Sequence, residues 1–169
     1  MKLKLFFVIL VIIILPVTNN CFGNNETQSY YGHLDLGEGI FMVLKLDVDE
    51  KGKPIRLYCV PDEIIISKDN QLADELRMID DKNLTPDNLK KIKKAFTNLE
   101  ETSFRISESS LNNRNLSFIS TRQKMKPNYD ISFQFKGTQF KNSIYGDMTI
   151  IEYKGSKKEI SYGIAGLSR

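Results

Sequence analysis

Short segments in which apolar and polar residues strictly alternate constrain this chain more than any other feature of its sequence. The most regular segment is 129–136, where the odd-numbered positions are aromatic or aliphatic and the even-numbered positions are polar. The same period of two recurs at Ile160, Tyr162 and Ile164, and from residue 40 to residue 48. A period of two is that of a β-strand with two different faces. Several such strands joined by tight turns predict a mainly β fold, an antiparallel barrel or a sandwich.

The period changes to a helical one around residues 68–101. Apolar residues recur at helical spacing from Leu89 to Leu99, directly after Thr85-Pro86, a typical helix start. A shorter helix is expected from Asp69 onward, so a two-helix insertion around 68–101 interrupts the strands. The basic stretch Lys90–Lys94 is expected to be a solvated helix face, and its alternative role would be contact with an anionic lipid surface.

Further expectations concern the flanking segments. Ile55 and Cys59 are expected to share the inward face of a strand, and residues 63–67 are expected to form a short strand after it. Gly137-Thr138 and Gly146-Asp147 are expected to mark turns or bulges, because glycine weakens a strand and tolerates unusual backbone angles.

The first 23 residues have the organisation of a secretory signal peptide. Two lysines precede the unbroken apolar run Leu5–Leu15, which at about 11 residues is too short to span a bilayer. Removal of residues 1–23 would leave one β-rich domain, 24–169. Cys21 is a candidate for lipidation, and the chain would be attached to a membrane only in that case. The protein is therefore expected to be exported: secreted, periplasmic or lipid-anchored to the cell envelope.

Net charge excludes one class of partner. The full chain has 24 basic and 21 acidic side chains, a formal charge of +3. Lys2 and Lys4 lie in the leader, so the remaining chain has a formal charge of only +1. A dedicated nucleic-acid-binding protein needs a basic face, and we therefore expect no nucleic-acid partner.

The sequence contains no complete motif for metal binding or catalysis. Residues 47–52 resemble the start of a calcium loop, but Lys51 and Tyr58 stand at the fifth and twelfth positions, where ligands are required. An acidic hairpin turn is the favoured interpretation. The chain contains neither a Gly-x-Ser-x-Gly elbow nor a phosphate-binding glycine loop. We therefore predict no catalytic residues, no metal site and no cofactor.

The lone histidine and Cys59 could in principle form a nucleophile–base pair, since both lie on early strands. Strand alternation instead directs Cys59 inward, where a thiol is inert, and we expect His33 at the rim of the fold. A Ser-His-Asp triad could use only His33, and nothing in the sequence marks its serine. Hydrolase activity is therefore the least favoured of the functions considered.

Several segments together resemble a known type of module. They are Tyr31-Gly32-His33-Leu34, the hairpin at 49–52, Val60-Pro61-Asp62, Leu116–Ile119, Phe135–Gly137, Ile144–Gly146 and Leu167–Arg169. In this order they look like the small β module of secreted bacterial proteins, which often precedes a hydrolase domain. The resemblance implies a lipocalin-like barrel without catalytic activity of its own, and it carries no functional residues over to this chain.

These observations predict an exported, non-enzymatic β-barrel-like protein that binds a small apolar ligand or an envelope or extracellular partner. An eight-stranded barrel leaves a lumen just wide enough for one small ligand, although in a domain of this size side chains can fill it instead. One alternative is an interaction or inhibitor protein that acts through its loops and the helical insertion. Another is an unrecognised hydrolase or hydrolase-associated protein. The ligand-binding residues stay undetermined at this stage.

Overall fold

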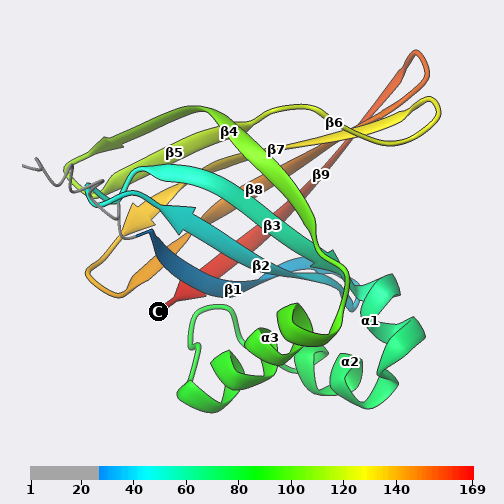
Figure 1. Ribbon diagram of the computed structural model, residues 1–169, viewed down its shortest axis with the longest axis horizontal. Helices are drawn as coiled ribbons and strands as arrows, with labels where there is room; N and C mark the ends of the chain where they lie inside the picture. Colours follow the sequence, from blue (N-terminus) through cyan, green and yellow to red (C-terminus); the bar gives the residue numbers. More distant parts are fainter. Residues whose placement is uncertain (1–26) are drawn as a thin grey trace, which may run out of the picture.

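The computed structural model describes residues 27–169, and its strands close into an antiparallel barrel (Figure 1). The expected signal peptide and Cys21 lie outside the described residues. The elements are β1 (Gln28–Gly37), β2 (Ile40–Val48), β3 (Pro54–Pro61), α1 (Asp62–Lys68), α2 (Asn70–Arg77), α3 (Pro86–Asn98), β4 (Thr102–Asn112), β5 (Asn115–Ser120), β6 (Gln123–Lys126), β7 (Tyr129–Gln139), β8 (Ser143–Lys154) and β9 (Lys157–Ser168).

Eight of the strands form the barrel. Their order is β5-β4-β3-β2-β1-β9-β8-β7, and pairing of β5 with β7 closes the ring. The ninth strand, β6, pairs only with the first residues of β7. The hairpins β6–β7 and β8–β9 project together from one end of the barrel (Figure 1). We call this projection, residues 122–131 and 151–161, the wing. The predicted fold class is confirmed, and the barrel is the correct one of its two alternatives.

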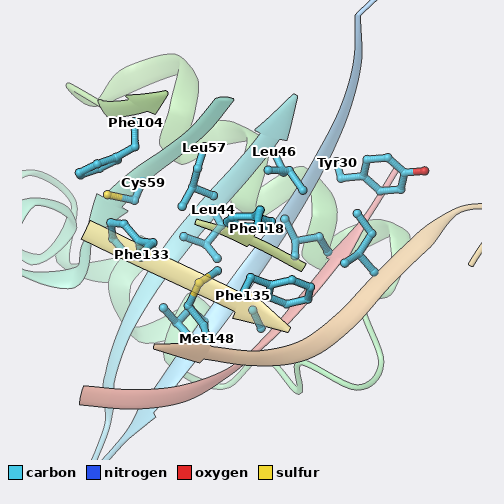
Figure 2. Packing of buried hydrophobic residues seen from close by; sticks show 14 of the residues in the cluster. Tyr30, Leu44, Leu46, Leu57, Cys59, Phe104, Phe118, Phe133, Phe135 and Met148 are labelled. Atoms are coloured by element: carbon cyan, nitrogen blue, oxygen red, sulfur yellow. The ribbon is translucent and has the colours of Figure 1, made fainter. Parts of the chain in front are cut away.

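Apolar side chains fill the interior of the barrel. Phe104 and Phe133 meet edge to face with their ring centroids 4.8 Å apart, and Phe118 stacks on Phe135 at 5.2 Å. Figure 2 shows these rings clustered in the barrel interior, where Phe118 and Phe135 come from the paired strands β5 and β7. The buried cluster consists of Tyr30, Leu34, Leu44, Leu46, Val48, Leu57, Cys59, Phe104, Leu116, Phe118, Ile131, Phe133, Phe135, Ile144, Met148, Ile150, Ala165 and Leu167. These residues occupy the space in which an open barrel of this size would hold a ligand.

Two glycines lie inside strands, where the sequence suggested turns or bulges. Gly137 on β7 and Gly146 on β8 stand directly opposite each other within continuous pairing. A Cβ on Gly137 would lie 2.6 Å from Cζ of Phe135, so the missing side chain leaves room for that ring. The expectation of turns was wrong, because here glycine is required for close packing across two strands rather than for chain reversal.

The helices cover the outer face of β1–β3 (Figure 1). A second apolar cluster forms between the two layers, and its sheet side is Phe41, Val43 and Val60. Its helix side is Ile65, Leu72, Ala73, Leu76, Ile79, Ile92 and Ala95. The helical insertion is confirmed, with three helices instead of two. Among residues 27–169, no helix combines the length and the apolar character needed to cross a membrane.

The additional helix is α1, where a short strand was expected over residues 63–67. Pro61 stands at its N-cap position with extended backbone angles, and Asp62 and Glu63 occupy the first turn. Acidic side chains there interact favourably with the helix dipole. Only Ile65 of the three consecutive isoleucines is buried, and it packs into the second cluster. Packing against β2 and β3 therefore overrides the strand preference of a β-branched run.

The expected orientation of Ile55 was also wrong. Val48 pairs with Pro54 while Asp47 pairs with Arg56, so Ile55 is the extra residue of an irregularity in the ladder. Its side chain is exposed. Beyond this point the alternation is regular, and Cys59 faces the barrel interior as predicted.

Candidate functional site

A large recess lies on the outer face of the barrel and crosses β4, β5, β7, β8 and β9. Its volume is about 860 Å³. Strand register places the outward side chains that line it in two adjacent rows across the strands. The first row is Glu108, Ile119, Gln134, Thr149 and Tyr162, and the second is Ser110, Ser117, Lys136, Asp147 and Ile164. We call this recess the outer groove.

Apolar and polar side chains both line the outer groove. Tyr162 and Ile164 on β9 form an apolar side, and on the opposite side Ile119 of β5 is followed by Glu108 and Ser110 of β4. The floor consists of the polar residues that β7 and β8 contribute, including Lys136 and Asp147, which stand opposite each other. The Tyr162 side chain is 69% exposed, which is unusually high solvent exposure for a large aromatic residue. The groove therefore combines apolar contact area with hydrogen-bonding groups of both kinds.

The sequence contains a signal for this site, but the signal does not say which face of the strand it marks. Alternation at Ile160, Tyr162 and Ile164 is real, yet all three side chains face outward and are exposed. The residues between them face the interior, where β9 is buried at Ala165 and Leu167. Small side chains suffice on that inner face because Gly163 lies against Leu34 and Leu36 of β1. Apolar alternation alone does not identify the buried face of a strand.

His33 is not at the rim, as expected, but beneath the helical insertion. It lies on the outer face of β1, 2% exposed, between Val43 of β2 and Gly166 of β9. Its ring stacks on Phe41 with the centroids 5.2 Å apart. Its Nδ1 forms a short hydrogen bond with Oδ1 of Asp81, in the loop between α2 and α3. The expectation failed because nothing local to β1 shows that helices cover its outer face.

This contact holds the α2–α3 loop on the seam where β1 meets β9. Burial raises the pKa of Asp81, and the neighbouring Asp35 raises it further, while the hydrogen bond and charge of His33 oppose that shift. Gly166 lies directly under the loop, and a Cβ there would overlap the backbone carbonyl of Asp81. The absence of a side chain at Gly166 therefore lets the α2–α3 loop lie directly against this seam.

His33 and Asp81 are the residue types of two members of a serine-hydrolase triad, but the described residues place no nucleophile beside them. Nε2 of His33 is buried and has no hydrogen-bond partner among the described residues. A triad requires a hydroxyl or thiol within hydrogen-bond reach of that nitrogen. Cys59 cannot supply it, because its side chain faces the barrel interior, on the opposite face of the sheet. The two residues of the conceivable Cys59–His33 pair are thus not brought together.

Cys59 is expected to be chemically inert in the folded protein. Burial, with a smaller contribution from Glu101, raises the pKa of its thiol to about 12. Only about one thiol in ten thousand would then be ionised at pH 8. In a chain with Cys21 replaced by Ser, an Ellman-type reagent should label Cys59 in denaturant within minutes and barely at all under native conditions. Rapid, complete labelling of the native protein would contradict this placement.

The remaining charged motifs have structural partners. Oδ1 of Asp49 accepts hydrogen bonds from the backbone amides of Lys51 and Lys53, both at 2.9 Å, as in a hairpin turn. Within the described chain no group of three or more His, Cys, Asp or Glu residues is arranged to hold a metal ion. The basic face of α3 forms ion pairs or stacks on the sheet: Lys90 with Asp87, Lys91 with Glu75, Lys94 with Asp69, and Lys93 over Tyr31.

Comparison with known proteins does not assign this architecture to a family. The chain matches no protein-family model, no curated protein and no solved structure. The function must therefore be inferred from the barrel and its surface.

Proposed function

We propose that this protein is an exported, non-enzymatic barrel of lipocalin-like architecture that binds an extended segment of a partner protein in its outer groove. The single observation that carries the proposal is the open groove of about 860 Å³ with three exposed apolar side chains, Tyr162 and Ile164 on β9 and Ile119 on β5. Export rests on the leader-like residues 1–23 of the sequence.

A protein segment fits this groove better than a small apolar molecule. Small-molecule sites usually enclose roughly 70–90% of the surface of a drug-sized ligand in a largely apolar cavity. Here the barrel interior is filled by side chains, and the groove is open with a polar floor. A peptide backbone offers donors and acceptors to Gln134, Thr149 and their neighbours, while its side chains cover the exposed apolar residues.

The helical insertion is a weaker candidate for the same role. Its apolar residues pack on β1–β3, and most of the basic residues of α3 are engaged in ion pairs. Met78, at the end of α2, is nevertheless 85% exposed. Deleting the insertion would uncover Phe41 and Val43, so a point substitution, Met78→Lys, is the appropriate test of this surface.

Site-specific photocrosslinking in the cells that naturally produce the protein tests the proposal. A benzophenone side chain placed at Tyr162 or at Ser117, both in the groove, should yield adducts with the same partner. The same group at Asn98, on the exposed end of α3, should yield none. Ile164→Asp should lower the yield at Ser117 at least about tenfold, since a carboxylate would be desolvated in the complex. Ile164→Val is the matched control and should crosslink normally.

Other outcomes would overturn the proposal. Crosslinking from Asn98, abolished by Met78→Lys and absent from the groove positions, would assign partner binding to the helical insertion. A bound small molecule detected by native mass spectrometry of protein from its natural source, and lost in Ile164→Asp, would make the groove a ligand site. Absence of groove crosslinks in the producing cells would also contradict the proposal.

A further inference from the structure

One half of β9 has a free edge, because among the described residues no strand pairs with it on the side away from β8. Pairing between β1 and β9 runs from Asp35 opposite Ile164 to Tyr31 opposite Ser168. Residues 157–162 pair only with β8 in the described chain, whereas Gly163 already lies against Leu34 and Leu36 of β1. This half of β9 belongs mostly to the wing, which extends away from the barrel (Figure 1). An unpaired strand edge of this length is a template onto which another strand can add.

Strand geometry identifies the groups that face this edge. The carbonyl oxygen of Gly166 lies against Gly32 of β1, so the backbone of Gly166 is directed to the β1 side. In an antiparallel ladder, residues two apart direct their amide and carbonyl groups to the same side. No register shift interrupts the pairing of β9 with β8. The backbone groups of Ile160 and Tyr162 therefore face the open edge, and those of Ser161 face β8.

The side chains next to this edge form a continuous apolar line with the groove. Ile160 and Tyr162 point to the outer face, followed by Ile164, and all three are exposed. Tyr162 and Ile164 also form one side of the outer groove. A strand added along β9 would therefore pack alternate side chains against Ile160 and Tyr162, and its continuation would enter the groove.

The charge at this edge determines which segment it would accept. Lys154 pairs with Glu152 at 3.2 Å and with Glu159 at 2.6 Å. Lys157 and Lys158 have no carboxylate within ion-pair distance among the described residues. Across residues 122–130 and 152–159, basic side chains outnumber acidic ones by six to three, although the chain from Asn24 onward is nearly neutral. The edge therefore favours an acidic partner strand and disfavours a second copy of the equally basic wing.

We propose that the open edge of β9, residues 157–162, binds an extended acidic segment of a partner protein by strand addition. The segment carries carboxylates opposite Lys157 and Lys158 and apolar residues that pack on Ile160 and Tyr162. Main-chain hydrogen bonds supply affinity, and the alternate side chains supply specificity. The inference rests on the proposed function, since it names the binding mode of the partner that enters the outer groove.

Amide exchange measured by NMR tests the binding mode, with the eight-residue peptide Thr-Val-Thr-Val-Thr-Glu-Glu-Thr as the probe. In antiparallel addition its valines lie opposite Tyr162 and Ile160, and its glutamates lie opposite Lys158 and Lys157. We call it the Glu–Val peptide, and the Lys–Val peptide has lysine at both glutamate positions. Saturating peptide should slow exchange of the Ile160 and Tyr162 amides at least about tenfold, because these groups gain partners. The Ser161 amide, already paired with β8, should change little. Ile160→Pro removes one edge amide and should weaken peptide binding about tenfold. Ile160→Thr keeps the amide and the strand preference, and should bind within about threefold of the unmodified protein.

Several results would overturn the inference. They are failure of the Glu–Val peptide to bind at millimolar concentration, equal binding of a Lys–Val peptide, and uniform protection of edge and β8-facing amides. Edge protection that grows with protein concentration without peptide would assign the edge to a second copy. Stronger protection by phosphatidylglycerol vesicles than by peptide would assign it to an anionic membrane. If groove crosslinking succeeds but the alternating protection is absent, only the strand-addition mode fails. If crosslinking fails, the proposed function fails as well.

Discussion

Truncating Phe133 to Ala is expected to lower the free energy of unfolding by about 3–5 kcal/mol, the range for loss of a buried aromatic ring. Phe133 is fully buried at the centre of the barrel, and its ring meets that of Phe104 edge to face. Strands surround the ring, and their paired backbones limit how far they can collapse into the space it leaves. Urea denaturation followed by circular dichroism measures the change in the midpoint and slope.

Phe140 provides the matched control for this loss. It is the same residue type, it lies just beyond the end of β7, and it is 48% exposed. Phe140→Ala removes the same number of atoms from a site that water already reaches, so the free energy of unfolding should change by less than about 1 kcal/mol. Equal effects of the two substitutions would contradict the filled-barrel description.

The second large effect on stability is expected from Gly166→Ala, which adds a single methyl group. Gly166→Ala should lower the free energy of unfolding by about 3 kcal/mol, since the added Cβ would overlap the carbonyl of Asp81 and push the α2–α3 loop from the seam. The hydrogen bond between Asp81 and His33 would then be lost, and the buried imidazole would have no partner. Denaturation reports the stability, and limited proteolysis of the native protein should show a new cleavage between residues 78 and 85.

Ile164→Ala separates this effect from a general weakening of β9. Ile164 lies two residues before Gly166 on the same outer face, but its side chain is exposed. Its truncation should cost less than about 1 kcal/mol and leave the proteolytic pattern unchanged. A Gly166→Ala protein with native stability and no new cleavage would show that the loop does not need this close approach.

Much of the barrel could be predicted because, in its most regular strand, the alternation of apolar and polar residues shows which side chains face inward. Residues 133–136 alternate as predicted, with Phe133 and Phe135 buried and Gln134 and Lys136 exposed, whereas Ser132, predicted to face outward, is buried. The C-terminal hairpin was equally clear, since Gly155 takes a positive φ in the turn between β8 and β9. In both segments, local pattern and tertiary packing favour the same conformation.

The parts that could not be predicted depend on contacts between distant segments. Phe41 and Val43 interrupt the alternation of β2, and apolar residues of both parities are typical of a strand that is buried on both faces. The His33–Asp81 contact joins positions 48 apart in the sequence, and no spacing rule foretells it. The outer groove was missed for a different reason: exposed apolar residues on β9 have the same period as buried ones.

The order in which the strands meet has a consequence for how the chain can mature. β1 pairs with β9, the first described strand with the last, and Arg169 donates a hydrogen bond to Oε1 of Gln28 at 2.5 Å. During synthesis, the ring therefore stays open, with an unpaired edge on β1, until β9 has emerged from the ribosome. A chain of this connectivity stays unclosed while it is threaded through a membrane pore. For the export that we propose, this strand order would keep folding incomplete until the last strand has crossed the membrane.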